Sequence, residues 1–84
     1  MRDDLMDKIR HIGLRISYFR KMRSLTQADL AQRVHINKYY LSQIECGAGN
    51  KIISLPLLIE ISEVLNIRVA ALVNFEDLQE EADP

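Results

Sequence analysis

Cysteine is nearly absent from this sequence, since Cys46 is the only one among 84 residues. One cysteine excludes an internal disulfide framework and is typical of a reducing compartment. No apolar run reaches the roughly 18 residues that span a bilayer, and the acids Asp3 and Asp4 stand where a secretory signal needs a basic stretch. These absences predict a cytoplasmic protein with no membrane partner, provided that the 84 residues are the whole mature chain.

The residues that enzymes and metal sites require are also sparse. His11, His35 and Cys46 do not have the spacing of metal ligands. No glycine-rich phosphate-binding loop is present, and no serine or cysteine stands beside a base with an orienting acid. The sequence therefore predicts no catalytic residue, no cofactor and no metal, and we do not expect an enzyme.

The net charge of −1 conceals an uneven distribution along the chain. Residues 1–40 hold nine lysines and arginines against four acids, whereas residues 41–84 hold two against eight. A phosphate backbone responds to the local field of one face and not to the total charge. The distribution is therefore compatible with a nucleic-acid partner, and equally with two solvated faces of opposite sign.

Apolar residues recur at three- and four-residue spacing, without the alternation that is typical of a strand. The first series predicts an amphipathic helix of about five turns, formed around Leu5, Ile9, Ile12, Ile16 and Phe19. Gly13 weakens the middle of this helix, which favours an ordered start after Leu5.

Capping residues indicate where the later helices begin and end. Side chains that accept a hydrogen bond from a first helical turn predict three starts, at Thr26, Asn37 and Ser54. Residues that tolerate a left-handed backbone predict two ends, at Gly47 and Asn66. With a short fifth helix over residues 69–75, the predicted fold is an all-α, five-helix domain over residues 1–75, followed by an acidic tail over 76–84.

Two short helices joined by a turn without proline form the centre of this domain, at about residues 26–46. Their inner residues are small or aliphatic: Ala31, Val34, Ile36, Leu41 and Ile44. Ala31 leaves room for two helices to cross steeply within a few residues. This arrangement is typical of a helix-turn-helix, whose second helix enters the major groove of DNA.

The outward face of that second helix carries Lys38, Tyr39, Ser42 and Gln43, with no acid before Glu45. Lys38 can donate to guanine O6 and N7, and Gln43 can form paired hydrogen bonds with adenine. Tyr39 offers its ring to a thymine methyl group and its hydroxyl to a base or a phosphate. The pattern favours a DNA-reading face over an ordinary solvated one.

Residues 9–73 resemble the Cro and phage-repressor type of helix-turn-helix domain, the xenobiotic-response-element (XRE) family. The matching segments are Thr26-Gln27-Ala28-Asp29-Leu30-Ala31, Leu41-Ser42-Gln43-Ile44-Glu45 with Gly47, Ile16-Ser17-Tyr18-Phe19-Arg20, Ser54-Leu55 and Leu65-Asn66-Ile67. His35 and Ser24 stand where the family usually has glycine, and Cys46 where it often has a basic or polar residue. The resemblance implies a compact lambda-repressor-like domain of bacterial or phage origin.

The resemblance also implies a role for individual residues. Those that match base-reading positions are Lys38, Tyr39, Ser42 and Gln43. Those that match phosphate-binding positions are Gln27, Tyr40 and Lys51. Arg20 and Glu45 match a structural ion pair, which would hold the framework and read no base.

The family implies a transcriptional regulator that binds a palindromic operator in double-stranded DNA as a homodimer, with repression favoured over activation. Surplus apolar residues form either more core or a dimer patch: Leu57, Val69, Val73, Phe75 and Leu78. The competing hypothesis is a protein-interaction module, such as an antitoxin-like or anti-regulator partner, indicated by the acidic and apolar C-terminal half. Such a module can also bind its own operator.

Overall fold

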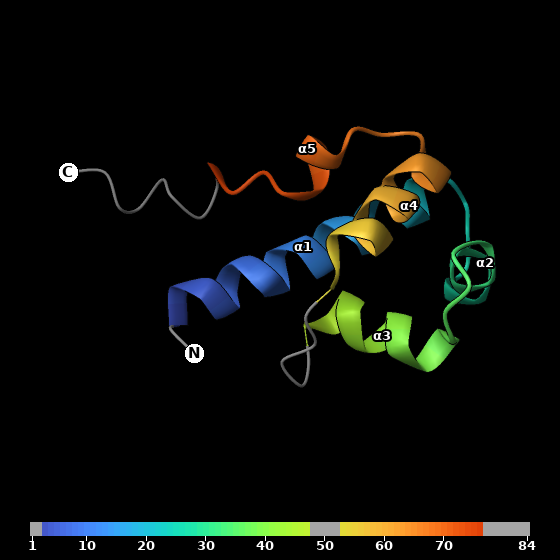
Figure 1. Cartoon of the computed structure of the whole chain (residues 1–84), viewed down its shortest axis with the longest axis horizontal. Helices are drawn as coiled ribbons and strands as arrows, with labels where there is room; N and C mark the ends of the chain where they lie inside the picture. The colour runs from blue at the N-terminus through green and yellow to red at the C-terminus, as the bar shows by residue number, and fades with distance from the viewer. Residues whose placement is uncertain (1–2, 48–52, 77–84) are drawn as a thin grey trace.

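The computed structural model describes residues 3–47 and 53–76, in which the chain forms five α-helices and no strand (Figure 1). The helices are α1 (Asp3–Met22), α2 (Gln27–Arg33), α3 (Lys38–Cys46), α4 (Leu55–Leu65) and α5 (Val69–Leu72). The predicted all-α architecture with five helices is confirmed within these ranges. Lys51, Leu78 and the expected acidic tail from residue 77 onward lie outside the described residues.

In Figure 1, α1 runs through the middle of the molecule, with α3 along one edge and α5 along the opposite one. Contacts between residues join α1 to both of these helices. None of the helices in the described ranges is long and apolar enough to cross a membrane.

The predicted helix starts at Thr26, Asn37 and Ser54 are confirmed by their hydrogen bonds. The Asn37 side chain accepts from the backbone N–H of Tyr40 at 2.7 Å, and the Ser54 hydroxyl accepts from that of Leu57 at 3.3 Å. The predicted ends are confirmed as well, because Gly47 and Asn66 have positive φ angles of 70° and 56°. These local signals fix the bounds of α3 and α4.

Gly13 does not weaken α1, which extends without interruption from Asp3 to Met22. The expected start after Leu5 is therefore wrong. Gly13 is buried, and a Cβ at this position would lie 1.9 Å from the carbonyl oxygen of Ile44 in α3. The absent side chain lets the backbones of α1 and α3 come into contact, so packing against α3 outweighs the low helix propensity of glycine.

The fifth helix is shorter than the predicted 69–75, because α5 ends at Leu72. Beyond it, the Asn74 side chain accepts a hydrogen bond from the backbone N–H of Glu76 at 3.0 Å. Such a local bond competes with helix continuation. Phe75 instead lies beside α1, with its ring centroid 6.0 Å from that of His11 and 5.7 Å from Lys8 Nζ.

The core is formed by buried apolar side chains from each of the five helices. Its largest fully buried side chains are Ile16, Leu30, Leu41, Ile61, Leu65 and Leu72. Three residues that the sequence left open between core and dimer patch, namely Leu57, Val69 and Val73, are half-buried and pack against this core. Their apolar surface is therefore used largely within the domain.

Candidate nucleic-acid interface

A tight turn joins α2 to α3, and the two helices are in contact. The backbone N–H of Ile36 donates to Ala31 at 3.0 Å and that of His35 to Gln32 at 3.3 Å, which closes the end of α2. His35 has a φ of 60°, and Ser24, in the preceding turn, has a φ of 59°. Both residues thus have the left-handed conformation that glycine usually provides at these positions of the family. Ala31, on α2, is buried.

α3 presents two opposite faces. Leu41, Ile44 and Glu45 are buried against the rest of the domain. Lys38 and Tyr39 are exposed, with 72% of Tyr39 open to solvent, and the outward pair Ser42 and Gln43 is half-buried. The four residues predicted to read bases therefore lie together on the solvent side of α3. We call this surface the α3 face (Lys38, Tyr39, Ser42 and Gln43).

Two residues of the α3 face are hydrogen-bonded to each other. The Gln43 side-chain N–H donates to the Tyr39 hydroxyl at 2.9 Å. The Gln43 amide keeps its oxygen and a second N–H, which together are the groups that pair with adenine. The four-residue spacing allows this contact, but the sequence alone does not indicate that the two side chains bind each other.

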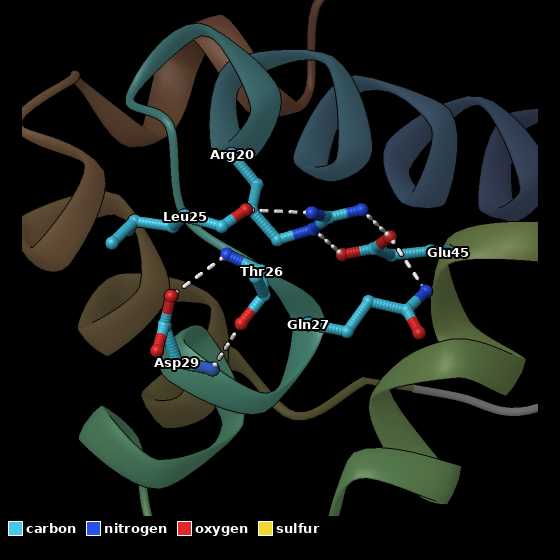
Figure 2. A network of polar contacts seen from close by, with 6 residues as sticks. All are labelled: Arg20, Leu25, Thr26, Gln27, Asp29 and Glu45. Carbon is cyan, nitrogen blue, oxygen red and sulfur yellow. Dashed lines mark hydrogen bonds and ion pairs between the residues drawn. The ribbon is translucent and has the colours of Figure 1, made fainter.

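The predicted ion pair between Arg20 and Glu45 is present, and both residues are buried (Figure 2). Arg20 Nε lies 2.7 Å from one Glu45 oxygen and Arg20 Nη2 lies 2.8 Å from the other. The remaining guanidinium nitrogen, Nη1, donates to the Leu25 carbonyl at 2.7 Å. The pair therefore ties α1 both to α3 and to the segment that leads into α2, and every charged atom has a partner.

Gln27 belongs to the same network, a contact that was not predicted from the sequence. Its side-chain N–H donates to a Glu45 oxygen at 3.1 Å, as Figure 2 shows. Because an ionised carboxylate only accepts hydrogen bonds, Glu45 fixes which end of the Gln27 amide faces it. The sequence indicates this contact only through the residue types, an amide at the first position of α2 and a carboxylate at position 45. These residue types do not specify how α2 packs against α3.

The Thr26 cap orders the start of α2 beside Gln27. The Thr26 hydroxyl accepts from the backbone N–H of Asp29, and the Asp29 carboxylate accepts from that of Thr26, each at 3.0 Å (Figure 2). The Thr26 N–H holds the pKa of the Asp29 carboxyl below its usual value of 3.8, with a second contribution from the Thr26 hydroxyl. The acid nearest the candidate interface on α2 is thus engaged in capping.

The remaining residues predicted to bind phosphate are placed unequally. Gln27 and Tyr40 are half-buried near the first turns of α2 and α3, and Lys51 lies outside the described residues. Cys46 is exposed at the end of α3, where its thiol donates to the Gln43 carbonyl at 3.6 Å. The structure thus brings together the α3 face and the Arg20–Glu45–Gln27 network. Lys51, the third residue predicted to bind phosphate, is not among the described residues.

Comparisons with known proteins identify the family. A helix-turn-helix family model matches residues 16–72. The immunity repressor protein of Bacillus phage phi105 is 39% identical over 70 residues, which is 83% of this chain and 47% of that protein. The chain therefore spans about half the length of this relative.

Solved structures agree with that match. SinR, the master regulator for biofilm formation, solved in complex with DNA, is 33% identical with a TM-score of 0.69, over 75% of this chain and 98% of that chain. The clp gene regulator ClgR from C. glutamicum is 27% identical with a TM-score of 0.73, over 79% and 82% of the two chains. The chain belongs to the Cro/C1-type helix-turn-helix family of transcriptional regulators, with the lambda-repressor-like fold.

Proposed function

We propose that this chain is a sequence-specific double-stranded DNA-binding regulator that reads the major groove with α3. The observation that carries the proposal is the α3 face, which gathers four hydrogen-bonding side chains and no acid on the solvent side of a firmly held helix. An ordinary exposed helix face would carry glutamates and lysines for solubility. Here the acid of α3, Glu45, is turned inward and neutralised by Arg20.

Within the α3 face we assign different bases to different side chains. Lys38, at the N-terminal end of α3, donates to guanine O6 and N7. Gln43 forms two hydrogen bonds with adenine, through the oxygen and the N–H that its bond to Tyr39 leaves available. Tyr39 contacts a thymine methyl group with its exposed ring, and Ser42 donates to a neighbouring base edge or accepts from it.

Backbone contacts flank these residues. Gln27 and Tyr40 lie near the N-terminal turns of α2 and α3, and we propose that both donate to phosphate oxygens, together with Lys51. Such contacts position the protein on the duplex and carry no sequence information. The network through Glu45 supports the role of Gln27, because it holds this side chain in one orientation before DNA arrives.

We further propose a cytoplasmic homodimer that occupies a palindromic operator and represses transcription by blocking a promoter. Two half-sites about one helical turn apart match two α3 helices related by a two-fold axis. The similarity to a phage immunity repressor and to a regulator solved with DNA supports this proposal.

Selection of bound sequences from a random duplex pool tests the proposal. We expect wild-type protein to select a palindrome. Lys38→Ala should relax the preference at one base position of each half-site by about 1–3 kcal/mol. Gln27→Ala should weaken binding to all duplexes alike. Recovery of no consensus, or equal effects of both changes on every sequence, would refute the division between base and phosphate contacts.

A second candidate function, an interaction module for a protein partner, is supported by one neighbour. The complex of SinR protein with SinI protein contains a chain that is 32% identical to this one, with a TM-score of 0.69. Co-expression followed by pull-down distinguishes the two functions. One stoichiometric protein partner together with no retention on DNA would favour the interaction module over the regulator.

A further inference from the structure

The outer side of α1 carries apolar side chains that the core does not use. Leu14, Tyr18 and Met22 recur at four-residue spacing and are 59%, 59% and 57% exposed. Residues four apart lie above one another on the same side of a helix. Isolated exposed apolar residues are ordinary, whereas these three form a continuous surface along the helix. We call it the α1 stripe (Leu14, Tyr18 and Met22).

Contacts of neighbouring residues fix the direction in which the α1 stripe points. Gly13 lies against α3, and the Arg15 guanidinium donates to the backbone oxygen of Ala71 in α5. Successive residues of a helix are rotated by about 100°, so Leu14 points away from both helices and nearly opposite the buried Ile16. The α1 stripe therefore faces solvent, on the side of α1 that neither α3 nor α5 covers.

Charges of opposite sign stand at matched distances on either side of Leu14. Asp7 precedes Leu14 by seven residues and Lys21 follows it by seven, and both are exposed. Arg10 precedes it by four and Tyr18 follows it by four. The Asp7 carboxylate pairs with Arg10 within α1. Among the exposed residues of α1, Asp7 and Lys21 thus carry opposite charges at positions that an antiparallel reversal about Leu14 would exchange.

We propose that the α1 stripe is the surface through which two copies of this chain pair, with their α1 helices antiparallel about Leu14. This register brings Asp7 of each copy to Lys21 of the other, while the stem of Arg10 stays against Gly47 of its own copy. Leu14 meets its own counterpart, as an isologous two-fold interface requires. A parallel arrangement would instead place Asp7 beside Asp7 and Lys21 beside Lys21.

The arrangement is compatible with the DNA complex proposed above, and in this respect it rests on that function. The two-fold axis of an antiparallel helix pair is perpendicular to the plane that contains both helices. Since α3 packs against the Gly13 side of α1, both copies of α3 lie on the same side of this plane. Both α3 faces can then meet one duplex.

The exposed apolar residues of α4 fit a second copy less well. Leu55 and Ile59 lie on α4, with 62% and 39% of their surfaces exposed. The exposed charged residues of α4 are Glu60 and Glu63, both acids. Pairing of two α4 helices would therefore gather charge of one sign, whereas α1 provides both signs in register.

Sedimentation velocity of the 84-residue chain without DNA tests the proposal. We expect a reversible dimer. Leu14→Glu places two carboxylates at the two-fold axis and should raise the dimer dissociation constant about tenfold or more. Leu55→Glu, a change of the same type at an equally exposed leucine of α4, should leave it unchanged. Circular dichroism verifies that both variants fold.

Charge reversals test the register itself. Asp7→Lys and Lys21→Asp should each weaken the dimer about tenfold, because each places like charges opposite each other. The double reversal restores opposite charges and should return the dissociation constant to within about threefold of wild type. The proposal would be overturned if the wild type were still a monomer at about 1 mM, or if Leu14→Glu and Leu55→Glu changed the dissociation constant equally. It would also be overturned if the double reversal dimerised more weakly than either single variant.

Failure of this proposal is distinguishable from failure of the proposed function. If the wild type selects a DNA sequence while the α1 variants dimerise as the wild type does, the proposed dimer interface is wrong and the proposed DNA-binding function is retained. If the α1 substitutions dissociate the dimer but the wild type selects no sequence from the duplex pool, the proposed dimer interface is retained and the proposed DNA-binding function is wrong.

Discussion

Gly13 occupies the closest contact between two helices of this domain. A methyl group at this position would lie 1.9 Å from the Ile44 carbonyl oxygen, a backbone atom that cannot move aside without shifting α3. We predict that Gly13→Ala lowers the free energy of unfolding by about 3 kcal/mol, although alanine is the better helix former. Urea denaturation measures the change. Ser17→Ala, at a half-buried site of α1, is the control, and equal stability of the two variants would contradict the contact.

Asp29 gives the domain a defined response to acid. The Thr26 backbone N–H stabilises the ionised carboxylate and lowers the pKa of Asp29 below 3.8 in the folded state. Its stabilising contribution is therefore complete above the unfolded-state pKa and disappears as the pH falls through the lowered folded-state pKa. Thermal unfolding of wild type and Asp29→Asn should differ at neutral pH and converge as the pH falls towards about 2. A difference that stays constant over this range would refute the capping role.

Tyr39 is predicted to orient Gln43 as well as to contact DNA. Tyr39→Phe removes only the oxygen to which the Gln43 amide donates, and leaves the ring in place. We expect the preference at the base that Gln43 reads to fall by about 1 kcal/mol, the usual contribution of one hydrogen bond. Competition binding with duplexes changed at that base measures it. Ser17→Ala, on α1 and outside the α1 stripe, serves as the control, and an equal loss in both variants would exclude an orienting role.

At the scale of the elements, one guanidinium, that of Arg20, joins α1 to α3 and to the segment that leads into α2. We predict that Glu45→Ala costs about 3–5 kcal/mol of unfolding free energy, because it leaves the buried Arg20 charge without its partner. The double change Arg20→Met with Glu45→Leu should recover most of this loss, since apolar residues of similar size replace both charges. Denaturant unfolding of the single and double variants provides the test. A double variant as unstable as Glu45→Ala would show that the pair itself is indispensable.

Elements whose signals are local were predictable from the sequence, and those that depend on packing were not. Thr26, Asn37 and Ser54 act on N–H groups only a few residues away, so their helix starts are correct. Periodicity also places the four residues of the α3 face on one side. Gly13 was misread because its contact with Ile44 depends on how α1 crosses α3. The bond from Gln27 to Glu45 depends likewise on the angle between α2 and α3.

At the scale of the whole molecule, the small net charge does not oppose DNA binding. The basic part of the sequence, residues 1–40, contains α1, α2 and the start of α3, whereas the acids concentrate in residues 41–84. A domain polarised in this way can attract phosphates at one surface despite a net charge of −1. The binding of phosphates also implies that affinity falls as the salt concentration rises.

The most direct test of the regulator is the ratio of two dissociation constants, for the selected duplex and for a shuffled duplex of equal composition, at about 0.15 M salt. We predict that wild-type protein binds the selected duplex about 1,000-fold or more tightly. Replacement of the whole α3 face by alanine should abolish most of that ratio without unfolding the domain. Equal affinity of wild type for the two duplexes, or an undiminished ratio in the alanine variant, would contradict sequence readout by α3.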